Sequence, residues 1–237
     1  ILSACEAKQE RLLRLKDYDT YLADLKEKVK NAEKKLQKSC EKVSDIRKKY
    51  AEKLVIAVTE ALKDLNFLDV VFEMRFDVLS NYTANGYDDA EFMISTNPGE
   101  PVRPLGNVAS GGELSRIMLA IKTVLADQDE VETLIFDEID SGISGRTAQM
   151  VSEKMNLLGR THQIICITHL PQIAAMADAH YLIEKAVSNG ATVSKIRRLD
   201  TAETVDELSR MLGGVEITDK VRESAREMKE LAAKKKK

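Results

Sequence analysis

The chain has 237 residues and a formal net charge of −3, with 43% apolar, 32% charged and only 5% aromatic residues, a balance that favours a helix-rich, partly elongated protein over a compact β-sandwich. No apolar run approaches the roughly 20 residues that span a bilayer, and the three cysteines lack a Cys-x-x-Cys spacing, which argues against a disulfide framework or a zinc site. We therefore expect a soluble protein of a reducing cytoplasm.

A heptad pattern runs through residues 1–66. One apolar series is Leu15, Leu22, Val29, Leu36, Val43 and Tyr50, and a second, interleaved series is Tyr18, Leu25, Ala32, Ser39 and Ile46. Steps of three and four predict a long helix that forms a left-handed coiled coil. Beyond Tyr50 the stripe moves to Leu54, Val58, Ala61 and Leu65, which indicates a four-residue stutter. We expect residues 1–66 to be one arm of a helical hairpin whose second helix lies upstream.

The periodicity changes to two after Asn66. Val70, Phe72, Met74, Phe76 and Val78 alternate with charged residues and predict a half-buried strand. Asn85 and Gly86 form a turn pair that favours a hairpin, with the returning strand at residues 90–95. Residues 97–106 contain three prolines and two glycines, and they predict a loop.

A helix with one apolar face is predicted directly after this loop. Ser110 lies at the N-cap position, and Gly111, Gly112 and Glu113 open the helix. A helix N-terminus preceded by small residues presents unpaired backbone N–H groups and the positive end of the helix dipole, which suits a phosphate. In isolation, an ordinary helix cap explains these residues more often than a phosphate site does, so the interpretation depends on the motifs that follow.

Two carboxylates follow the next apolar strand, which is predicted at residues 133–136. Asp137 and Glu138 would lie at the carboxyl edge of a sheet, where ligands of open α/β folds bind. Asp137 is suited to hold Mg²⁺, and Glu138 to orient or deprotonate an attacking water. A further apolar strand at residues 163–168 ends at His169, whose imidazole can reach a γ-phosphate from the strand end.

The remaining segments complete an α/β lobe. Residues 179–187 and 192–199 alternate like paired strands across Ser188, Asn189 and Gly190. We expect a helix with a capping box to begin at Thr204, a final helix over residues 218–233, and a frayed lysine tail at residues 234–237. Strands and helices interleave, so the fold class is α/β, with residues 67–237 as a lobe and residues 1–66 as a protruding coiled-coil arm.

One part of an ATP-hydrolysing site is absent from the sequence. No Gly-x-x-x-x-Gly-Lys-Ser/Thr phosphate loop occurs, although the backbone and lysine of such a loop hold the β- and γ-phosphates in P-loop enzymes. The chain also begins at Ile1 rather than methionine. We therefore expect it to be half of an ATPase, and to bind ATP poorly and hydrolyse none alone.

These motifs closely resemble an ABC-type ATPase head. The signature corresponds to residues 110–113, Walker B to residues 134–137 followed by Glu138, the D-loop to residues 141–144, and the switch histidine to His169. Within that superfamily, residues 97–105, 109–116 and 168–174 resemble the C-terminal half of the RecN family, SMC-like bacterial DNA repair proteins. Residue 109 is alanine where transporters usually place leucine, and residue 144 is serine where their D-loop usually ends in aspartate, so no D-loop contact is inferred from transporters.

The resemblance implies a head that is divided in the sequence. The phosphate loop lies in an N-terminal half, a coiled coil separates the halves, and two heads close on two ATP molecules. Ser110, Gly111, Gly112 and Glu113 would contact ATP held by the opposite subunit, Asp137 would hold Mg²⁺, and Glu138 and His169 would be catalytic. The implied partners are DNA, the protein's own N-terminal half and a second copy, with no membrane, and the implied location is the cytoplasm, at the nucleoid.

Two other functions stay open at this point. A transporter ATPase subunit is disfavoured, because a long heptad arm replaces the compact helical insert that would couple to a membrane partner. The other alternative is a non-catalytic coiled-coil scaffold, in which the acids at positions 137 and 138 are incidental. Basic pairs on the arm such as Lys34 and Lys35 could touch DNA phosphates, although an ordinary solvated coiled-coil surface explains them better.

Overall fold

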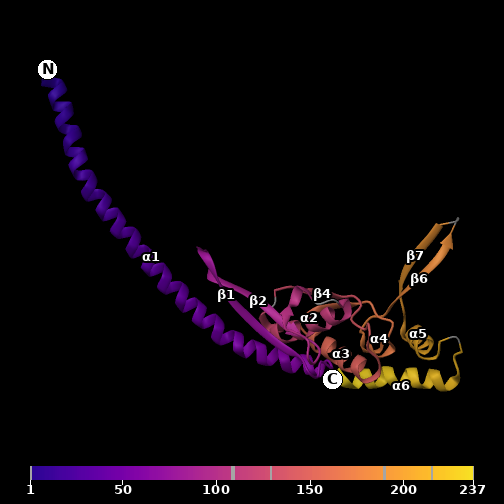
Figure 1. Cartoon of the computed structure of the whole chain (residues 1–237). Coiled ribbons are helices and arrows are strands. Elements are labelled where there is room, and N and C mark those ends of the chain that lie inside the picture. Colours follow the sequence, from indigo (N-terminus) through magenta and orange to yellow (C-terminus); the bar gives the residue numbers. More distant parts are fainter. Residues whose placement is uncertain (1, 108–109, 129, 189–190, 215, 237) are drawn as a thin grey trace. The chain divides into compact units, whose positions relative to one another are not determined.

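The computed structural model describes residues 2–107, 110–128, 130–188, 191–214 and 216–236 (Figure 1). It divides into two compact units. We call residues 1–53 together with 75–91 the arm unit, and residues 54–74 together with 92–237 the head unit. The unit boundary therefore passes through a long helix and through the hairpin that follows it. Each unit is described by itself.

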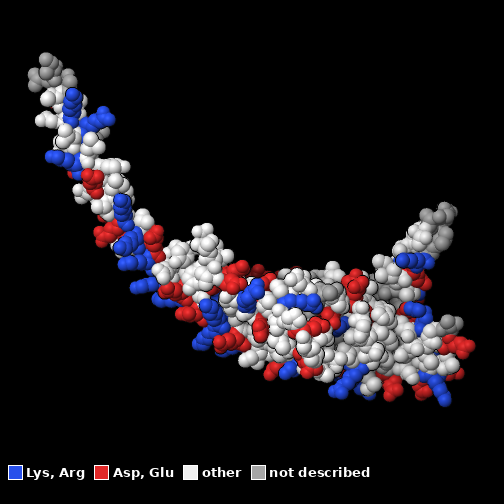
Figure 2. Space-filling view, in the orientation of Figure 1, with Lys and Arg blue, Asp and Glu red and all other residues white. Residues whose placement is uncertain are grey.

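Helix α1 spans Leu2–Asp64 and confirms the long helix expected from the heptads. It corresponds to a length of about 95 Å at 1.5 Å per residue. Within the arm unit the heptad stripe lies in solvent, with Leu15, Val29, Leu36, Ile46 and Tyr50 between 43% and 60% exposed. On the face that Figure 2 shows, Lys and Arg are interspersed with Asp and Glu along this helix.

A β-hairpin forms the second element of the arm unit. Strands β1 (Val71–Thr83) and β2 (Gly86–Ser95) are adjacent in a three-stranded sheet, and Gly86 turns between them with a φ of 100°. The hairpin predicted at Asn85 and Gly86 is confirmed, although the returning strand begins at Gly86 rather than at residue 90. The side chain of Asp88 is only 2% exposed and accepts hydrogen bonds from Ser44 Oγ at 2.6 Å and Arg47 Nη1 at 2.9 Å on α1.

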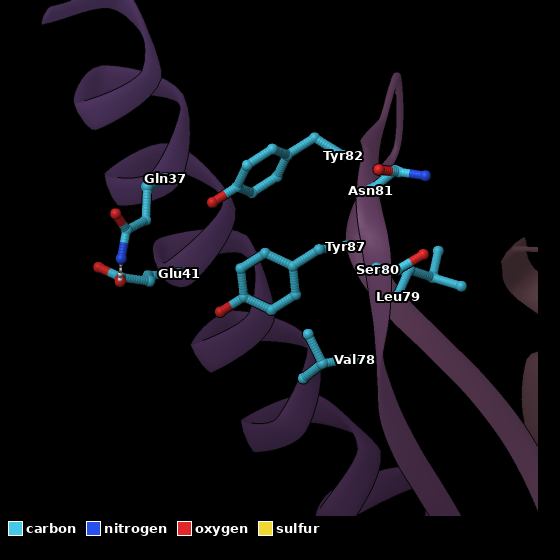
Figure 3. A pocket seen from close by; sticks show the side chains of 8 residues that line it. All are labelled: Gln37, Glu41, Val78, Leu79, Ser80, Asn81, Tyr82 and Tyr87. Atoms are coloured by element: carbon cyan, nitrogen blue, oxygen red, sulfur yellow. Dashed lines mark hydrogen bonds between the residues drawn. The ribbon is translucent and has the colours of Figure 1, made fainter. Parts of the chain in front are cut away.

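Next to this contact, α1 and the hairpin enclose an open cleft of about 330 Å³ (Figure 3). Tyr82 and Tyr87 point from the hairpin toward α1, where Gln37 and Glu41 form the opposite wall. The two tyrosine rings are 6.1 Å apart. The cleft belongs to the arm unit and contains none of the residues predicted for nucleotide.

The core of the head unit begins inside α1. Val58, Ala61, Leu62 and Leu65 are buried against Ile117, Leu119 and Val151. The shift of the apolar stripe after Tyr50, which the sequence suggested was a stutter, thus reflects the helix entering this core. The helix ends at Asp64, and Asn66 follows with a φ of 70°, a left-handed conformation that asparagine tolerates at helix ends.

The central part of the head unit follows the predicted order. The loop after β2 contains the short strand β3 (Arg103–Pro104) and the 3-10 turn η1 (Leu105–Asn107). Helix α2 (Gly111–Leu125) leads through η2 (Ala126–Gln128) to β4 (Thr133–Phe136), and α3 (Gly145–Leu158) leads to β5 (Gln163–Cys166). Strands β4 and β5 pair in parallel, with Phe136 opposite Cys166, and α4 (Pro171–Met176) follows.

The end of the chain forms a ribbon and two helices. Strands β6 (Tyr181–Ser188) and β7 (Ala191–Arg198) are antiparallel, as predicted, and residues 189–190 of their predicted turn lie outside the described residues. Helix α5 (Thr201–Gly213) begins before Thr204, because the capping box is formed by Asp200 and Glu203. The predicted start at Thr204 was wrong.

Helix α6 (Asp219–Lys235) begins after the Thr218 N-cap and confirms the final helix. The lysine tail, expected to fray, instead forms ion pairs in the described part of the chain. Lys235 contacts Glu153, and Lys236 Nζ lies 2.5 Å from Asp178 Oδ1.

Candidate functional site

Strands β4 and β5 bring the predicted acids and the predicted histidine to one edge of the head unit. Because the strands are parallel and in register, their carboxyl ends coincide. Asp137 and Glu138 follow Phe136, and Thr168 and His169 follow the end of β5. The backbone N–H of Ile167 continues the pairing by donating to the carbonyl of Phe136 at 3.0 Å.

The N-terminus of α2 lies against the same edge. Ser110 caps the helix in extended conformation, and its Oγ accepts from the N–H of Glu113 at 3.4 Å. A Cβ at position 111 would lie 2.8 Å from Glu138 Oε2, and one at position 112 would lie 2.8 Å from Ser141 Cβ. Two consecutive glycines thus permit the helix end to approach the acidic loop closely. The structure brings together the residues predicted for phosphate and those predicted for catalysis.

The two acids differ in conformation. Glu138 has a φ of 56°, in the left-handed region where a non-glycine residue carries backbone strain of about 1–3 kcal/mol. Such strain clusters at functional sites. Asp137 is exposed, its Oδ1 accepts from the N–H of Glu138 at 2.9 Å, and its backbone carbonyl accepts from Ser115 Oγ at 2.9 Å.

The sequence interpretation assigned no role to Asp140, which the structure places beneath His169. Its side chain is 4% exposed, and its Oδ2 accepts from Thr168 Oγ1 at 2.6 Å and from the backbone N–H of His169 at 2.8 Å. The Nδ1 of His169 lies 3.1 Å from the same oxygen. A third carboxylate so soon after the strand was the signal that the sequence offered. Ile139 and Asp140 are both buried in the structure.

Arg116 is a second functional candidate that sequence reasoning missed. It lies on α2, is 7% exposed, and its Nη1 donates to the carbonyls of Ile139 at 3.2 Å and Ser141 at 2.9 Å. Its guanidinium also lies 5.5 Å from the ring of Phe67, just beyond the end of α1. Burial lowers the pKa of Arg116, an effect that Glu113 opposes. The residue fixes the backbone on both sides of Asp140.

The edge is rich in carboxylates. Its side chains alone do not form a site for a hard cation such as Mg²⁺, and they suit one only when a phosphate ligand completes the coordination. Burial raises the pKa of Cys166 to about 12, with further contributions from Asp140 and Asp137. Among the described residues, no group of three or more His, Cys, Asp or Glu side chains could hold a metal ion. Mg²⁺ commonly takes one or two carboxylates together with water and substrate phosphates, so that Asp137 as a single protein ligand is compatible with it.

Comparison with known proteins identifies relatives of the whole chain. No family model matches the sequence. The DNA repair protein RecN of Halalkalibacterium halodurans is 40% identical over 228 residues, which cover 94% of this chain and 40% of that protein. RecN of Bacillus subtilis is 39% identical over 243 residues, covering 96% of this chain and 42% of that protein. The chain is RecN-like. It spans about two fifths of the length of these relatives.

Solved structures agree on the fold. The Smc head domain with a coiled coil and joint from Pyrococcus yayanosii has a TM-score of 0.58 at 22% identity, covering 86% of this chain and 37% of that one. The Smc head domain with an extended coiled coil from Pyrococcus furiosus has a TM-score of 0.53 at 22% identity, covering 87% of this chain and 48% of that one. The α/β fold with a long helix, similar to SMC heads, is therefore confirmed. None of the helices within the described residues combines the length and apolar character needed to cross a bilayer.

Proposed function

We propose that the chain is the C-terminal part of an SMC-like ATPase that acts in DNA repair and recombination. The observation that carries the proposal is the meeting of a glycine-rich helix N-terminus, two strand-end acids and a positioned imidazole at one edge of a RecN-like chain. We divide it into a coiled-coil arm, residues 1–66, and a head lobe, residues 67–237, with the last turns of the arm helix, from Leu54, also packing in the core of the head unit. With DNA as its partner, the intact protein would reside in the cytoplasm at the nucleoid.

The roles of the residues follow from their chemistry. Glu138 is exposed at the strand end, where its carboxylate can accept a proton from an attacking water. Asp137 would hold Mg²⁺, which neutralises the charge developing on the phosphates. His169 presents its ring to the same edge, and 73% of its side chain is exposed. Nucleotide hydrolysis is the reaction that uses all three groups together.

The helix N-terminus supplies the second half of the proposed arrangement. Ser110, Gly111, Gly112 and Glu113 carry backbone N–H groups at the positive end of the α2 dipole, which suits a γ-phosphate. We assign this surface to ATP held by a second copy of the head, so that two heads close on two nucleotides. The carboxylate of Glu138 lies beside Gly111 in this structure, and it must turn away when a phosphate occupies the helix end.

Exposed apolar surfaces support a partner segment that carries the phosphate loop. Parallel sheets are normally covered on both faces, yet Ile135 and Ile165 on one face of the β4–β5 sheet are 68% and 45% exposed, and Ile167, directly after β5, is 51% exposed. A ribbon of two strands is marginal by itself, and Ile183 and Ile196 on β6–β7 are also exposed. We assign these faces to the protein's own N-terminal half, and the free heptad stripe of α1 to an antiparallel helix from that half.

Two experiments test the proposal. In the intact protein, Glu138→Gln should preserve ATP-induced head pairing, measured by light scattering, while ATP turnover falls by at least about 100-fold. Unchanged turnover would refute the assignment of Glu138. The chain alone should bind ATP weakly and hydrolyse none, and addition of the N-terminal half should restore turnover. Hydrolysis by the purified chain alone would show that it does not depend on an external phosphate loop.

A further inference from the structure

The peptide group between the two strand-end acids is held by hydrogen bonds at both of its ends. Its carbonyl, that of Asp137, accepts from Ser115 Oγ at 2.9 Å, and its N–H, that of Glu138, donates to Asp137 Oδ1 at 2.9 Å. The next carbonyl, that of Glu138, accepts from the N–H of Ser141 at 2.9 Å. The peptides on both sides of Glu138 are therefore fixed, and Ser115 contributes the hydrogen bond that comes from α2.

Glu138 is strained in the conformation that these hydrogen bonds hold. Its φ of 56° lies in the left-handed region, which costs backbone energy for a residue with a side chain. Rotation of the preceding peptide by about 180° would bring φ to roughly −120°, an extended conformation that glutamate adopts without strain. The same rotation would break both hydrogen bonds of that peptide. The hydrogen bonds and the strain therefore oppose each other.

Ser115 is placed to prevent this rotation. A serine within a helix commonly donates to a carbonyl one turn earlier in its own helix, whereas Ser115 in α2 donates across to the loop after β4. The net contribution of one hydrogen bond and the strain at one left-handed residue are of similar size. Loss of the Ser115 hydroxyl is therefore enough to shift the balance toward the rotated peptide.

We propose that Ser115 is a positioning residue, which holds the Asp137–Glu138 peptide against rotation and thereby orients both acids. The functional consequence rests on the proposed function, whereas the conformation of Glu138 does not. In the held conformation, the N–H of Glu138 fixes the Asp137 carboxylate, which we assign to Mg²⁺. After rotation this N–H points away from Asp137, and the backbone that carries the Glu138 carboxylate changes direction. Both carboxylates then lose the orientation that hydrolysis requires.

The first test measures the conformation of Glu138 in the 237-residue chain. At a φ of 56° the amide and α hydrogens of a residue are nearly eclipsed, and at about −120° they lie on opposite sides of the N–Cα bond. We expect a strong nuclear Overhauser effect between these two hydrogens of Glu138 in the wild type and its loss in Ser115→Ala. Ser115→Thr, which keeps the hydroxyl, should retain it, as should Ser224→Ala, which removes an exposed serine from α6.

Two results of this measurement would overturn the proposal. A weak effect in the wild type would show that Glu138 is not left-handed, and this result requires no variant to fold. A strong effect in Ser115→Ala would show that the peptide is held without the hydroxyl.

The second test uses the intact protein. Ser115→Ala should lower kcat by about three- to tenfold with KM for ATP nearly unchanged, and Ser115→Thr should restore most of the turnover, whereas Ser224→Ala should leave it unchanged. Unchanged kcat in Ser115→Ala, or equal losses in Ser115→Ala and Ser115→Thr, would overturn the functional role of the hydroxyl. A wild-type protein without ATPase activity would contradict the proposed function instead, and the first test would then decide the proposal alone.

Discussion

The approach of α2 to the acidic loop makes Gly112 the most informative position for substitution. A Cβ at position 112 would lie 2.8 Å from Ser141 Cβ and 2.9 Å from the carbonyl oxygen of Glu138. Neither atom is the end of a flexible side chain, so Gly112→Ala must push the helix and the loop apart. Overpacking of this kind costs about 1–3 kcal/mol. The better helix propensity of alanine recovers up to ~1 kcal/mol, so an overpacking cost of about 2 kcal/mol leaves a net loss of roughly 1–2 kcal/mol.

Gly111→Ala provides a matched control one residue away. A Cβ there would meet Glu138 Oε2 at 2.8 Å, but this atom ends a flexible side chain that can rotate into solvent. We expect Gly111→Ala to be neutral or to stabilise the chain by up to ~1 kcal/mol, because the helix propensity of alanine is gained there without overpacking. Urea denaturation of the two variants, compared with the wild-type chain, measures the difference. Equal losses at both positions would refute the argument that the acidic loop packs against the helix N-terminus as described.

Three further substitutions test other contacts. Burial raises the pKa of Asp88, but the hydrogen bonds from Ser44 and Arg47 and the charges of Arg47 and Lys48 outweigh this effect and hold the pKa below its ordinary value. The contribution of Asp88 to stability should therefore be complete above the pKa of the unfolded chain and be lost as the pH falls toward the lower folded pKa. Hydrogen exchange of hairpin amides should show this loss, and Asp88→Asn should remove the pH dependence whereas Asp89→Asn should not. Arg116→Lys should lower the free energy of unfolding by about 1–3 kcal/mol, because lysine cannot reproduce the planar contacts with two carbonyls and a ring; a loss below ~0.5 kcal/mol would contradict this. Lys229 Nζ donates to the carbonyls of Ala175 and Ala177 at the end of α4, so Lys229→Met should cost about 1–3 kcal/mol in the same assay while the exposed Lys220→Met does not.

Local patterns in the sequence predicted the elements well where side-chain period and turn chemistry agreed. The helix over residues 2–64, the hairpin at Gly86, the strand before Asp137 and the helix after Ser110 all follow from spacing and caps. The start of α5 was missed because two capping signals overlap. The structure forms the capping box of Asp200 and Glu203 and not that of Thr204 and Glu207. Thr204 is buried in the first turns of the helix, where its hydroxyl donates a hydrogen bond to the carbonyl of Asp200.

Contacts between distant residues could not be predicted from such patterns. Arg116 and Ser141 are 25 residues apart in the sequence. The spacing of apolar residues in either segment does not indicate that one guanidinium will donate hydrogen bonds to two loop carbonyls. Asp140 was likewise given no role in the sequence interpretation. Its role depends on the parallel register of β4 and β5, which brings Thr168 and His169 above it.

The residues that hold the candidate site and those that would act on a ligand form two distinct groups by burial. Gly112, Arg116 and Asp140 are buried and join α2 to the loop after β4, whereas Glu138 and His169 are exposed. Substitution of a buried member should therefore change both stability and any activity, because the same contacts serve the core and the site. Substitution of an exposed member should change activity alone. Measuring both the free energy of unfolding and the turnover of each variant therefore distinguishes two cases. If the site is preorganised, the two groups of substitutions differ as described, whereas acids and an imidazole that are adjacent by chance would show no such difference.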